Sequence, residues 1–269
     1  MNLTLNNGNS MPQLGLGVYK VGQDIAVQLV QQAIEVGYRR IDTAALYDNE
    51  VEVGAGVRRS GLPREELFVT TKIWNDRQGF DNATEAIDEA LERLNIGYID
   101  MMLIHWPCPK QDLYIETWAA LEQALAQGKV KNIGVSNFQP NQLDRLVESA
   151  NVIPAINQVE LHPGFQQSEV RAANAKHGVL TEAWSPLGRG RFDQSAILQA
   201  IAKKHEKSVA QVIIRWHLQL GNLVIPKTSN PDRLVENFNV NDFRLNSDDM
   251  KAIATLDAGE RIGPNPDDF

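Results

Sequence analysis

The sequence predicts a (β/α)8 barrel, or TIM barrel: a closed sheet of eight parallel strands inside a ring of helices. Short apolar segments alternate with longer segments of helical periodicity, eight of each. Polar residues directly follow several of the apolar segments, which is where such a barrel carries its functional side chains. The chain has 269 residues, and barrels of roughly 250 residues commonly form one domain.

The first element predicted along the chain is an N-terminal β-hairpin. Two short apolar segments, residues 3–5 and 11–14, flank the pair Asn7-Gly8. Asn-Gly readily supplies the positive φ values of a tight turn. A hairpin therefore precedes the barrel.

Strands and helices are then expected to alternate. Continuous apolar runs are typical of strands buried on both faces, and they predict strands at residues 14–16, 39–41, 67–71, 99–104, 131–135, 155–159, 180–183 and 223–225. Apolar residues three and four apart predict helices at residues 25–36, 50–59, 83–94, 114–127, 142–150, 168–177, 195–205 with 209–219, and 232–237. Right-handed crossovers between parallel strands produce this alternation.

After the eighth unit, a further short helix is expected to begin at 247–250, with Ser247 as its N-cap. The C-terminal tail, residues 263–269, is too polar and too rich in turn residues for the core, but it can fold over the barrel mouth. No Gly/Ser-rich linker interrupts the sequence, so residues 1–269 are expected to form a single domain.

Composition excludes several classes of protein. The net charge of -8 lacks the basic footprint of a nucleic-acid-binding protein. Cys108 is the only cysteine, which rules out an internal disulfide and suits a reducing compartment. The N-terminus has no basic apolar leader, and no apolar stretch approaches the roughly 20 residues of a membrane span. A cytoplasmic protein without nucleic-acid or membrane partners is expected.

Residues after three of the predicted strands form a candidate proton-transfer site. Tyr47 is a poor acid near neutral pH unless a cation lowers its pKa, and Lys72 can be that cation. Asp42 can keep a buried lysine charged by pairing with it. His105 could donate to a substrate oxygen or relay the proton. Taken singly, each residue is more readily explained as structural, but together, at these positions, they favour a catalytic site.

Such a site has no electron source of its own, so it implies a cofactor. The five histidines are scattered and lack metal-ligand spacing, and no metal is expected. No Gly-x-Gly-x-x-Gly follows a strand, so a Rossmann subdomain is not available to bind a dinucleotide. The ends of the late strands are expected to bind the cofactor instead.

With these residues in order, the chain resembles the aldo-keto reductases over nearly its whole length. It is most similar to the short bacterial branch that includes 2,5-diketo-D-gluconate reductases and methylglyoxal or small-aldehyde reductases. The order and spacing of the motifs support the resemblance more than any single motif does. The motifs are Leu14-Gly15-Leu16-Gly17, Asp42-Thr43-Ala44 with Tyr47, Thr70-Thr71-Lys72, Leu103-Ile104-His105-Trp106-Pro107, Gly134-Val135-Ser136-Asn137-Phe138, Asn157-Gln158-Val159-Glu160, Ala183-Trp184-Ser185-Pro186-Leu187, and Ile225-Pro226-Lys227-Thr228 through Arg233, Glu236 and Asn237.

The resemblance implies catalytic roles for Asp42, Tyr47, Lys72 and His105 and a site for NADPH. Ser136, Asn137 and Gln158 would hydrogen-bond the nicotinamide carboxamide, because amides and a hydroxyl match its donors and acceptors. Trp184 would stack on the nicotinamide ring, where many family members have tyrosine. Further cofactor contacts carried over from the motifs are Ser185, Leu187, Glu236 and Asn237.

A cluster of cations and hydroxyls is expected to bind the 2'-phosphate of NADPH. Lys227, Thr228, Ser229 and Arg233 lie around the end of the eighth strand and the start of the next helix. Helix N-termini attract anions, and Lys and Arg add charge-assisted hydrogen bonds. The family usually has serine directly after the lysine, so the hydroxyl can come from Thr228 or Ser229. The alternative is a solvated basic helix start.

Tyr19, Trp74, His105 and Trp106 follow the first, third and fourth strands and would line a substrate pocket. The predicted function is NADPH-dependent reduction of an aldehyde or ketone, such as a small carbonyl, a dicarbonyl or a keto-sugar acid like 2,5-diketo-D-gluconate, by a monomer in which Tyr47 protonates the product oxygen. One alternative is a Schiff-base aldolase using Lys72, although a lysine paired with Asp42 is a poor nucleophile. Another is a non-catalytic NADPH-binding regulatory subunit.

Overall fold

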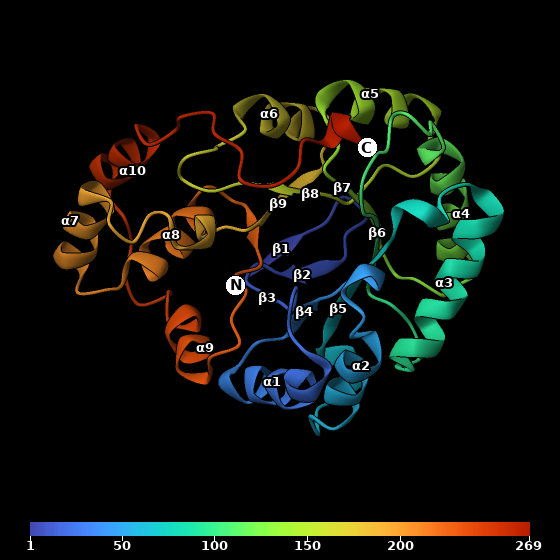
Figure 1. The fold of residues 1–269 in the computed structure, drawn as a ribbon, viewed down its shortest axis with the longest axis horizontal. Helices are drawn as coiled ribbons and strands as arrows, with labels where there is room; N and C mark the ends of the chain where they lie inside the picture. Colours follow the sequence, from blue (N-terminus) through green and yellow to red (C-terminus); the bar gives the residue numbers. More distant parts are fainter.

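The computed structural model describes all residues, Met1–Phe269, and confirms the (β/α)8 barrel (Figure 1). Eight parallel strands pair in chain order from β3 to β10. They are β3 (Leu16–Gly17), β4 (Arg40–Asp42), β5 (Phe68–Ile73), β6 (Met101–Ile104), β7 (Ile133–Ser136), β8 (Ile156–Glu160), β9 (Leu180–Trp184) and β10 (Leu223–Val224). Several of them continue beyond the predicted ends to include the first polar residue, as at Asp42 and Ser136.

Helices surround the sheet, and their apolar faces pack against it (Figure 1). They are α1 (Gln23–Val36), α2 (Glu50–Arg58), α3 (Phe80–Leu94), α4 (Tyr114–Ala126), α5 (Pro140–Ser149), α6 (Ser168–Lys176), α7 (Ala196–His205), α8 (Val209–Gln219), α9 (Pro231–Phe238) and α10 (Ser247–Ala254). Both α7 and α8 lie between β9 and β10, as the sequence predicts. No helix combines the length and apolar character that crossing a membrane requires.

The barrel closes where its first and last strands meet. Parallel bridges pair Leu14 with Val224 and Gly17 with Lys227. We call this junction of β3 and β10 the closure seam. Each of these two strands is only two residues long, so the seam contributes few backbone hydrogen bonds.

A buried arginine reinforces the closure seam. Arg40 Nη2 donates to the carbonyl oxygens of Gln13, at 3.0 Å, and Val224, at 2.9 Å, so one guanidinium ties both sides. A Cβ at Gly15 would lie 2.6 Å from Arg40 Nε. Glycine at position 15 therefore makes room for the arginine.

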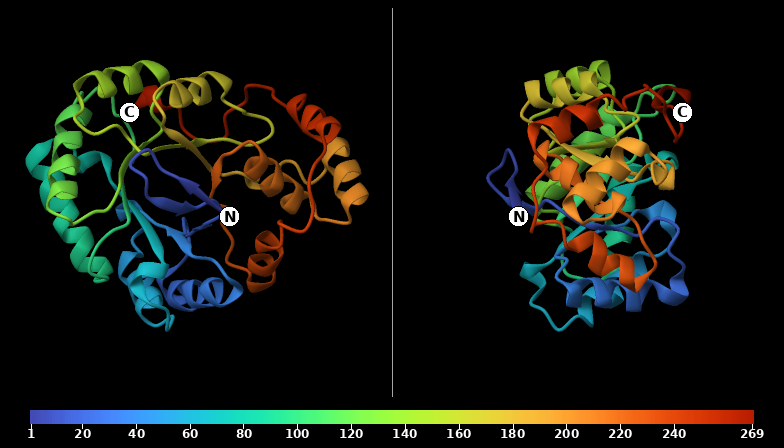
Figure 2. Two further views of the ribbon diagram at one scale, coloured as in Figure 1. Left: turned by 180° about the vertical axis from the view of Figure 1, so that it is seen from behind. Right: turned by 90° about the vertical axis from the view of Figure 1, so that its left-hand side faces the viewer.

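The predicted hairpin is present and closes one end of the barrel. β1 (Asn2–Thr4) pairs antiparallel with β2 (Ser10–Pro12), and Gly8 in the turn has φ +86°. Leu5 and Met11 are buried in an apolar cluster with Phe68, Met101, Leu103, Ala155, Ile156 and Leu223. Figure 2 shows the hairpin and the C-terminus on opposite sides of the barrel.

The C-terminal segment folds over the other end. The ring of Phe269 lies 4.5 Å from that of Trp106, and Lys110 Nζ donates to the backbone oxygen of Asp268 at 2.6 Å. The prediction of the α10 cap was wrong by one residue. Asn246, not Ser247, is the N-cap, because its side chain accepts from the backbone of the first helical turn.

Candidate active site

A cavity of about 290 Å³ opens at the carboxyl ends of the strands, under the C-terminal tail. All four residues predicted for the substrate pocket line it, as do Asp42, Tyr47, Ser136, Asn137, Gln158, Trp184, Ser185 and Lys227. The sequence analysis missed Gly17, Leu46, Arg189, Ile225, Pro264 and Phe269, which complete the lining. Loops and the tail supply most of these residues. The position of a loop relative to the cavity cannot be predicted from a local sequence pattern.

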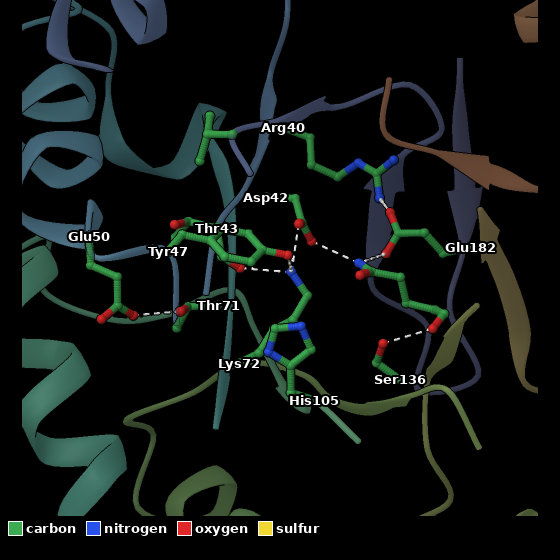
Figure 3. A network of polar contacts seen from close by, with 12 residues as sticks. Arg40, Asp42, Thr43, Tyr47, Glu50, Thr71, Lys72, His105, Ser136 and Glu182 are labelled. Atoms are coloured by element: carbon green, nitrogen blue, oxygen red, sulfur yellow. Dashed lines mark hydrogen bonds and ion pairs between the residues drawn. The ribbon is translucent and has the colours of Figure 1, made fainter. Parts of the chain in front are cut away.

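Lys72 connects the groups predicted to transfer the proton (Figure 3). Its Nζ donates to Asp42 Oδ1 at 2.6 Å and to the backbone oxygen of Thr43 at 2.8 Å, and it lies 3.5 Å from the hydroxyl of Tyr47. Asp42 ends β4, Lys72 lies near the end of β5, and Tyr47 follows β4 in a short 3-10 turn. The sheet thus brings together side chains 25 to 30 positions apart.

Burial and charge act in opposite directions at this lysine. Burial lowers the pKa of Lys72, but Asp42 and Tyr47 raise it by more, and the net pKa is above the ordinary value. The ammonium group therefore stays charged near neutral pH. Burial also raises the pKa of Tyr47 to about 12, and the nearby Lys72 limits that rise. The expectation that the cation would bring this pKa below its ordinary value was wrong, because burial has the larger effect.

His105 follows β6 and lies in the wall of the cavity. Its ring centroid is 5.8 Å from that of Tyr47 and 5.0 Å from that of Trp74. Burial, with a smaller contribution from Lys72, holds the pKa of His105 well below its ordinary value. The ring is therefore neutral near pH 7, and it can donate one N–H without carrying charge.

Asn137 joins the ends of two strands across the cavity. It has a left-handed backbone, with φ +66°, and its Nδ2 donates to the backbone oxygen of His105 at 2.9 Å. Its Oδ1 accepts from Trp184 Nε1 at 2.8 Å. Ser136 Oγ donates to the backbone oxygen of Gln158 at 2.8 Å. These four predicted cofactor residues thus form one connected group.

Gln158 also contacts two buried carboxylates, and one of them, Glu182, was not predicted from the sequence. Its Nε2 donates to Asp42 Oδ2 at 2.8 Å and to Glu182 Oε2 at 2.9 Å. The other carboxylate oxygen of Glu182 pairs with Arg40, and neither side chain is exposed. A signal was present, because charged residues at 40 and 182 lie within runs predicted to be buried strands, where a charge needs a partner.

The predicted phosphate cluster surrounds the start of α9. Lys227 and Arg233 are exposed, and neither lies within ion-pair distance of a carboxylate. Thr228 is buried, and its Oγ1 accepts from the backbone N–H of Asn230 at 3.0 Å, whereas the exposed Ser229 makes no side-chain hydrogen bond. The cluster therefore has two unpaired cations at a helix N-terminus, an arrangement that attracts anions.

The remaining predicted cofactor residues lie around this cluster and the cavity. Ser185 has φ +48° and follows β9, directly beside Trp184. Leu187, two residues further on, packs partly buried against the core. Glu236 and the buried Asn237 lie near the end of α9.

A barrel with a charged lysine, a protonated phenol and a neutral histidine beside an aromatic cavity has the groups that proton transfer to a small substrate would need. The chain belongs to the aldo/keto reductase family, whose model matches residues 13–258. It is therefore an oxidoreductase that acts on carbonyl groups.

Relatives of this chain carry specific names. The methylglyoxal reductase DkgA of Escherichia coli (strain K12) is 48% identical, over 99% of this chain and 97% of that protein. The glyoxal reductase of Bacillus subtilis (strain 168) is 48% identical, over 98% of this chain and 96% of that protein.

Solved structures share the fold and include cofactor complexes. A variant of Gox0644 in complex with NADPH has a TM-score of 0.95 and 45% identity, over 99% of this chain and 97% of that one. An aldo-keto reductase of Bombyx mori in complex with NADP has a TM-score of 0.92 and 36% identity, over 98% of this chain and 95% of that one.

Proposed function

We propose that this enzyme reduces small aldehydes, ketones or dicarbonyls with NADPH, and that Tyr47 is the acid. The observation that supports this most directly is the contact of the charged Lys72 with both Asp42 and Tyr47 at the base of the cavity. The phenol, whose pKa is raised to about 12, carries a proton at neutral pH. An alkoxide is a much stronger base than a phenolate, so Tyr47 can still protonate it.

The chain's own residues fit NADPH. The cavity offers amide and hydroxyl groups at Asn137, Gln158 and Ser136 and an indole face at Trp184, which suit a planar ring carrying a carboxamide. Lys227 and Arg233 suit a 2'-phosphate. When bound, NADPH supplies the hydride.

In the proposed mechanism, His105 orients the substrate carbonyl by donating an N–H to its oxygen. Tyr47 donates its proton to the same oxygen as negative charge develops there. Lys72 stabilises the resulting phenolate, and Asp42 keeps Lys72 charged. Trp74 and Trp106 line the cavity and exclude water.

The cavity favours a small substrate. Its volume is about 290 Å³, and aromatic rings form much of its wall. Methylglyoxal and glyoxal fit this description, and two relatives are named for reducing them. A keto-sugar acid such as 2,5-diketo-D-gluconate is the second candidate, because Arg189 lines the cavity and could meet its carboxylate.

Loss of NADPH absorbance in the presence of a panel of carbonyls tests this function. We expect turnover with methylglyoxal, glyoxal and other small aldehydes. Adding 2,5-diketo-D-gluconate and a neutral keto-sugar to the panel separates the two substrate classes. Absence of NADPH oxidation with every carbonyl, despite NADPH binding, would instead favour a regulatory subunit.

The aldolase alternative conflicts with the electrostatics of the site. A Schiff-base lysine must lose its proton to attack a carbonyl, whereas Asp42 and Tyr47 raise the pKa of Lys72. Borohydride should therefore trap no substrate on Lys72. We further propose that residues 1–269 form one domain and act as a cytoplasmic monomer, which sedimentation of the purified protein can test for the monomer.

NADPH should be preferred over NADH because of local charge, despite the net charge of -8. Charge-assisted contacts contribute roughly 1.5 to 3 kcal/mol each, so two could give a preference of about a hundredfold or more. Replacing both cations, with Lys227→Gly and Arg233→His, should weaken NADPH binding strongly and NADH binding little. Titrations at fixed ionic strength measure both. Equal losses for the two cofactors would mean that these cations do not read the 2'-phosphate.

Separate Thr228→Val and Ser229→Ala variants identify the hydroxyl. Thr228 Oγ1 already accepts a hydrogen bond from the backbone of Asn230, and Ser229 is exposed. We propose that Ser229 contacts the phosphate and that Thr228 shapes the loop. Only Ser229→Ala should then reduce the preference for NADPH without reducing stability.

A further inference from the structure

We propose that Glu182 and Arg40 are positioning residues that fix the direction of the Gln158 side-chain amide, so that only its oxygen faces the cavity. Gln158 can then accept a hydrogen bond from the cofactor but cannot donate one. This inference rests on the proposed function, because it takes Gln158 to meet the carboxamide of NADPH. It adds two buried residues, neither of which lines the cavity, to those that govern cofactor recognition.

The direction of the amide follows from its two partners. Gln158 Nε2 has two hydrogens, and it lies 2.8 Å from Asp42 Oδ2 and 2.9 Å from Glu182 Oε2. A flipped amide would aim its oxygen at two carboxylates and lose both hydrogen bonds. The two carboxylates together therefore hold the nitrogen on their side, turned away from the cofactor.

Arg40 pairs with Glu182 and favours its ionised form, which accepts hydrogen bonds, although burial leaves the pKa of Glu182 above its ordinary value. Its guanidinium contacts Glu182 Oε1, and both side chains are fully buried. Burial raises the pKa of Glu182, and the positive charge of Arg40 opposes that rise. Arg40 is itself held by the carbonyl oxygens of Gln13 and Val224 across the closure seam. The ion pair of Arg40 and Glu182 (Figure 3) is thus fixed to the backbone of the barrel.

The other atoms near Gln158 leave its oxygen free for the cofactor. No protein donor contacts Gln158 Oε1, although the residue lines the cavity. The nearby acceptor Asn137 Oδ1 is already bonded to Trp184. A carboxamide N–H entering this side of the cavity therefore finds its acceptor in Gln158. A ring substituent that lacks an N–H cannot make this contact.

An analogue without the amide nitrogen tests the inference. In the reduced 3-acetylpyridine analogue of NADPH, a methyl group replaces the amide NH2. Dissociation constants from fluorescence titration give the ratio of the two affinities without any turnover. The wild-type protein should prefer NADPH by a factor on the order of 2 to 10, the contribution of one neutral hydrogen bond.

Glu182→Gln should lower this ratio, and Asp42 remains as the one carboxylate that accepts from Gln158 Nε2. The new side chain has the same shape, and its amide oxygen can still accept from Arg40. Its nitrogen would then face Gln158 Nε2, donor against donor, and would favour turning the Gln158 amide. Glu182→Asp retains the carboxylate and should retain most of the preference. The separate NADPH-to-NADH preference should not change in either variant.

Glu50→Gln is the matched control. Glu50 is also a buried carboxylate, and it accepts from Thr71 and Arg93 without touching Gln158. The same chemical change there should leave the NADPH-to-analogue ratio as in the wild type. If Glu182→Gln does not fold, Arg40→Met combined with Glu182→Met removes both charges together and leaves neither unpaired. That double variant should lower the ratio at least twofold.

Gln158→Met separates the possible failures. If it removes the preference for NADPH over the analogue while the variants at 182 and 40 keep it, the positioning inference is overturned and the cofactor contact stands. If Gln158→Met also keeps the preference, the carboxamide does not meet Gln158, and the proposed mode of cofactor binding fails with it. A general loss of affinity for both ligands at an unchanged ratio likewise overturns the inference.

Discussion

Lys72 shows how one side chain can depend on the residues around it. A fully buried ammonium would ordinarily lose its proton, but Asp42 and the backbone oxygen of Thr43 both accept from it. The positive charge that Lys72 therefore keeps stabilises a phenolate at Tyr47, which would otherwise be unfavourable in a buried site. Lys72 therefore acts here as a fixed cation. Because it stays protonated, it does not act as a nucleophile.

Tyr47→Phe should remove most carbonyl reduction, because it deletes the proton donor and little else. General acid catalysis typically contributes on the order of 100- to 10,000-fold, so kcat should fall by a factor in that range. NADPH affinity should stay close to wild type, since the hydroxyl acts on the substrate. Steady-state assays and cofactor titrations check both. Near wild-type turnover in the folded variant would remove Tyr47 as the acid.

The pH dependence follows from the same phenol. Burial raises the pKa of Tyr47 to about 12, so the donating form is present below that pH and is lost as pH rises through it. For carbonyl reduction, kcat/KM should accordingly show no alkaline decline near neutral pH. The reverse reaction needs the phenolate and should become faster as pH rises. An alkaline decline near neutral pH that disappears in Tyr47→Phe would mean that this phenol titrates there, and it would contradict the raised pKa of Tyr47.

At the scale of elements, the tail is anchored to the end of β8. The buried carboxylate of Glu160 accepts from the backbone N–H groups of Ile262, at 2.6 Å, and Gly263, at 2.9 Å. A Cβ at Gly263 would lie 2.3 Å from the Trp184 ring. One strand end thus holds the segment whose last residue packs on the cavity wall.

Glu160→Gln should loosen the tail. Burial alone would raise the pKa of Glu160, but hydrogen bonds from His162, Ile262 and Gly263 lower it overall. The contribution of this carboxylate to stability is therefore present above its unfolded pKa and is lost as pH falls through its folded pKa. Faster hydrogen exchange at Ile262 and Gly263, with a raised KM for carbonyls, should follow.

Exposed Glu169 on α6 provides the control for that experiment. Glu169→Gln makes the same chemical change without touching the tail, and it should leave both exchange and KM unchanged. Unchanged exchange at Ile262 and Gly263 in Glu160→Gln would mean that other contacts anchor the tail.

The order of strands and helices was predictable, because burial on both faces leaves a clear apolar run. The residues at which the strands end were harder to predict. The prediction ended β4 at its last apolar residue, whereas backbone pairing continues to Asp42, because a ladder hydrogen bond does not depend on side-chain polarity. The four predicted catalytic residues could be located because each one comes after the apolar run of a predicted strand. They are Asp42, Tyr47, Lys72 and His105. Arg40 and Glu182 could not be paired, since their contact joins residues 142 positions apart.

At the scale of the molecule, stability and function lie at opposite ends of the barrel. The hairpin covers one end, and the C-terminal segment lies at the other (Figure 2), which is where the cavity opens. Substitutions at the hairpin should therefore change the free energy of unfolding without changing catalysis.

Met11→Ala should lower the free energy of unfolding by about 2 to 5 kcal/mol, because it empties a fully buried position in the hairpin cluster. Denaturant titration measures the loss, and kcat at a permissive temperature should be unchanged. Val51→Ala, at a residue that is 51% exposed, is the control and should have little effect. A parallel loss of kcat in Met11→Ala would mean that the two ends are coupled.

Arg40 also has a consequence for how the chain acquires its shape during synthesis. Of its acceptors, Gln13 emerges from the ribosome early, but Glu182 and Val224 emerge only when most of the chain has been made. Burying the guanidinium before then would leave a charge without its counterion. A nascent chain of four or five strands should therefore not form a closed, buried core around Arg40. It should remain partly open until the C-terminal third of the chain has been synthesised. Truncated chains that end before residue 182 should accordingly depend on chaperones and be degraded rapidly in the cell.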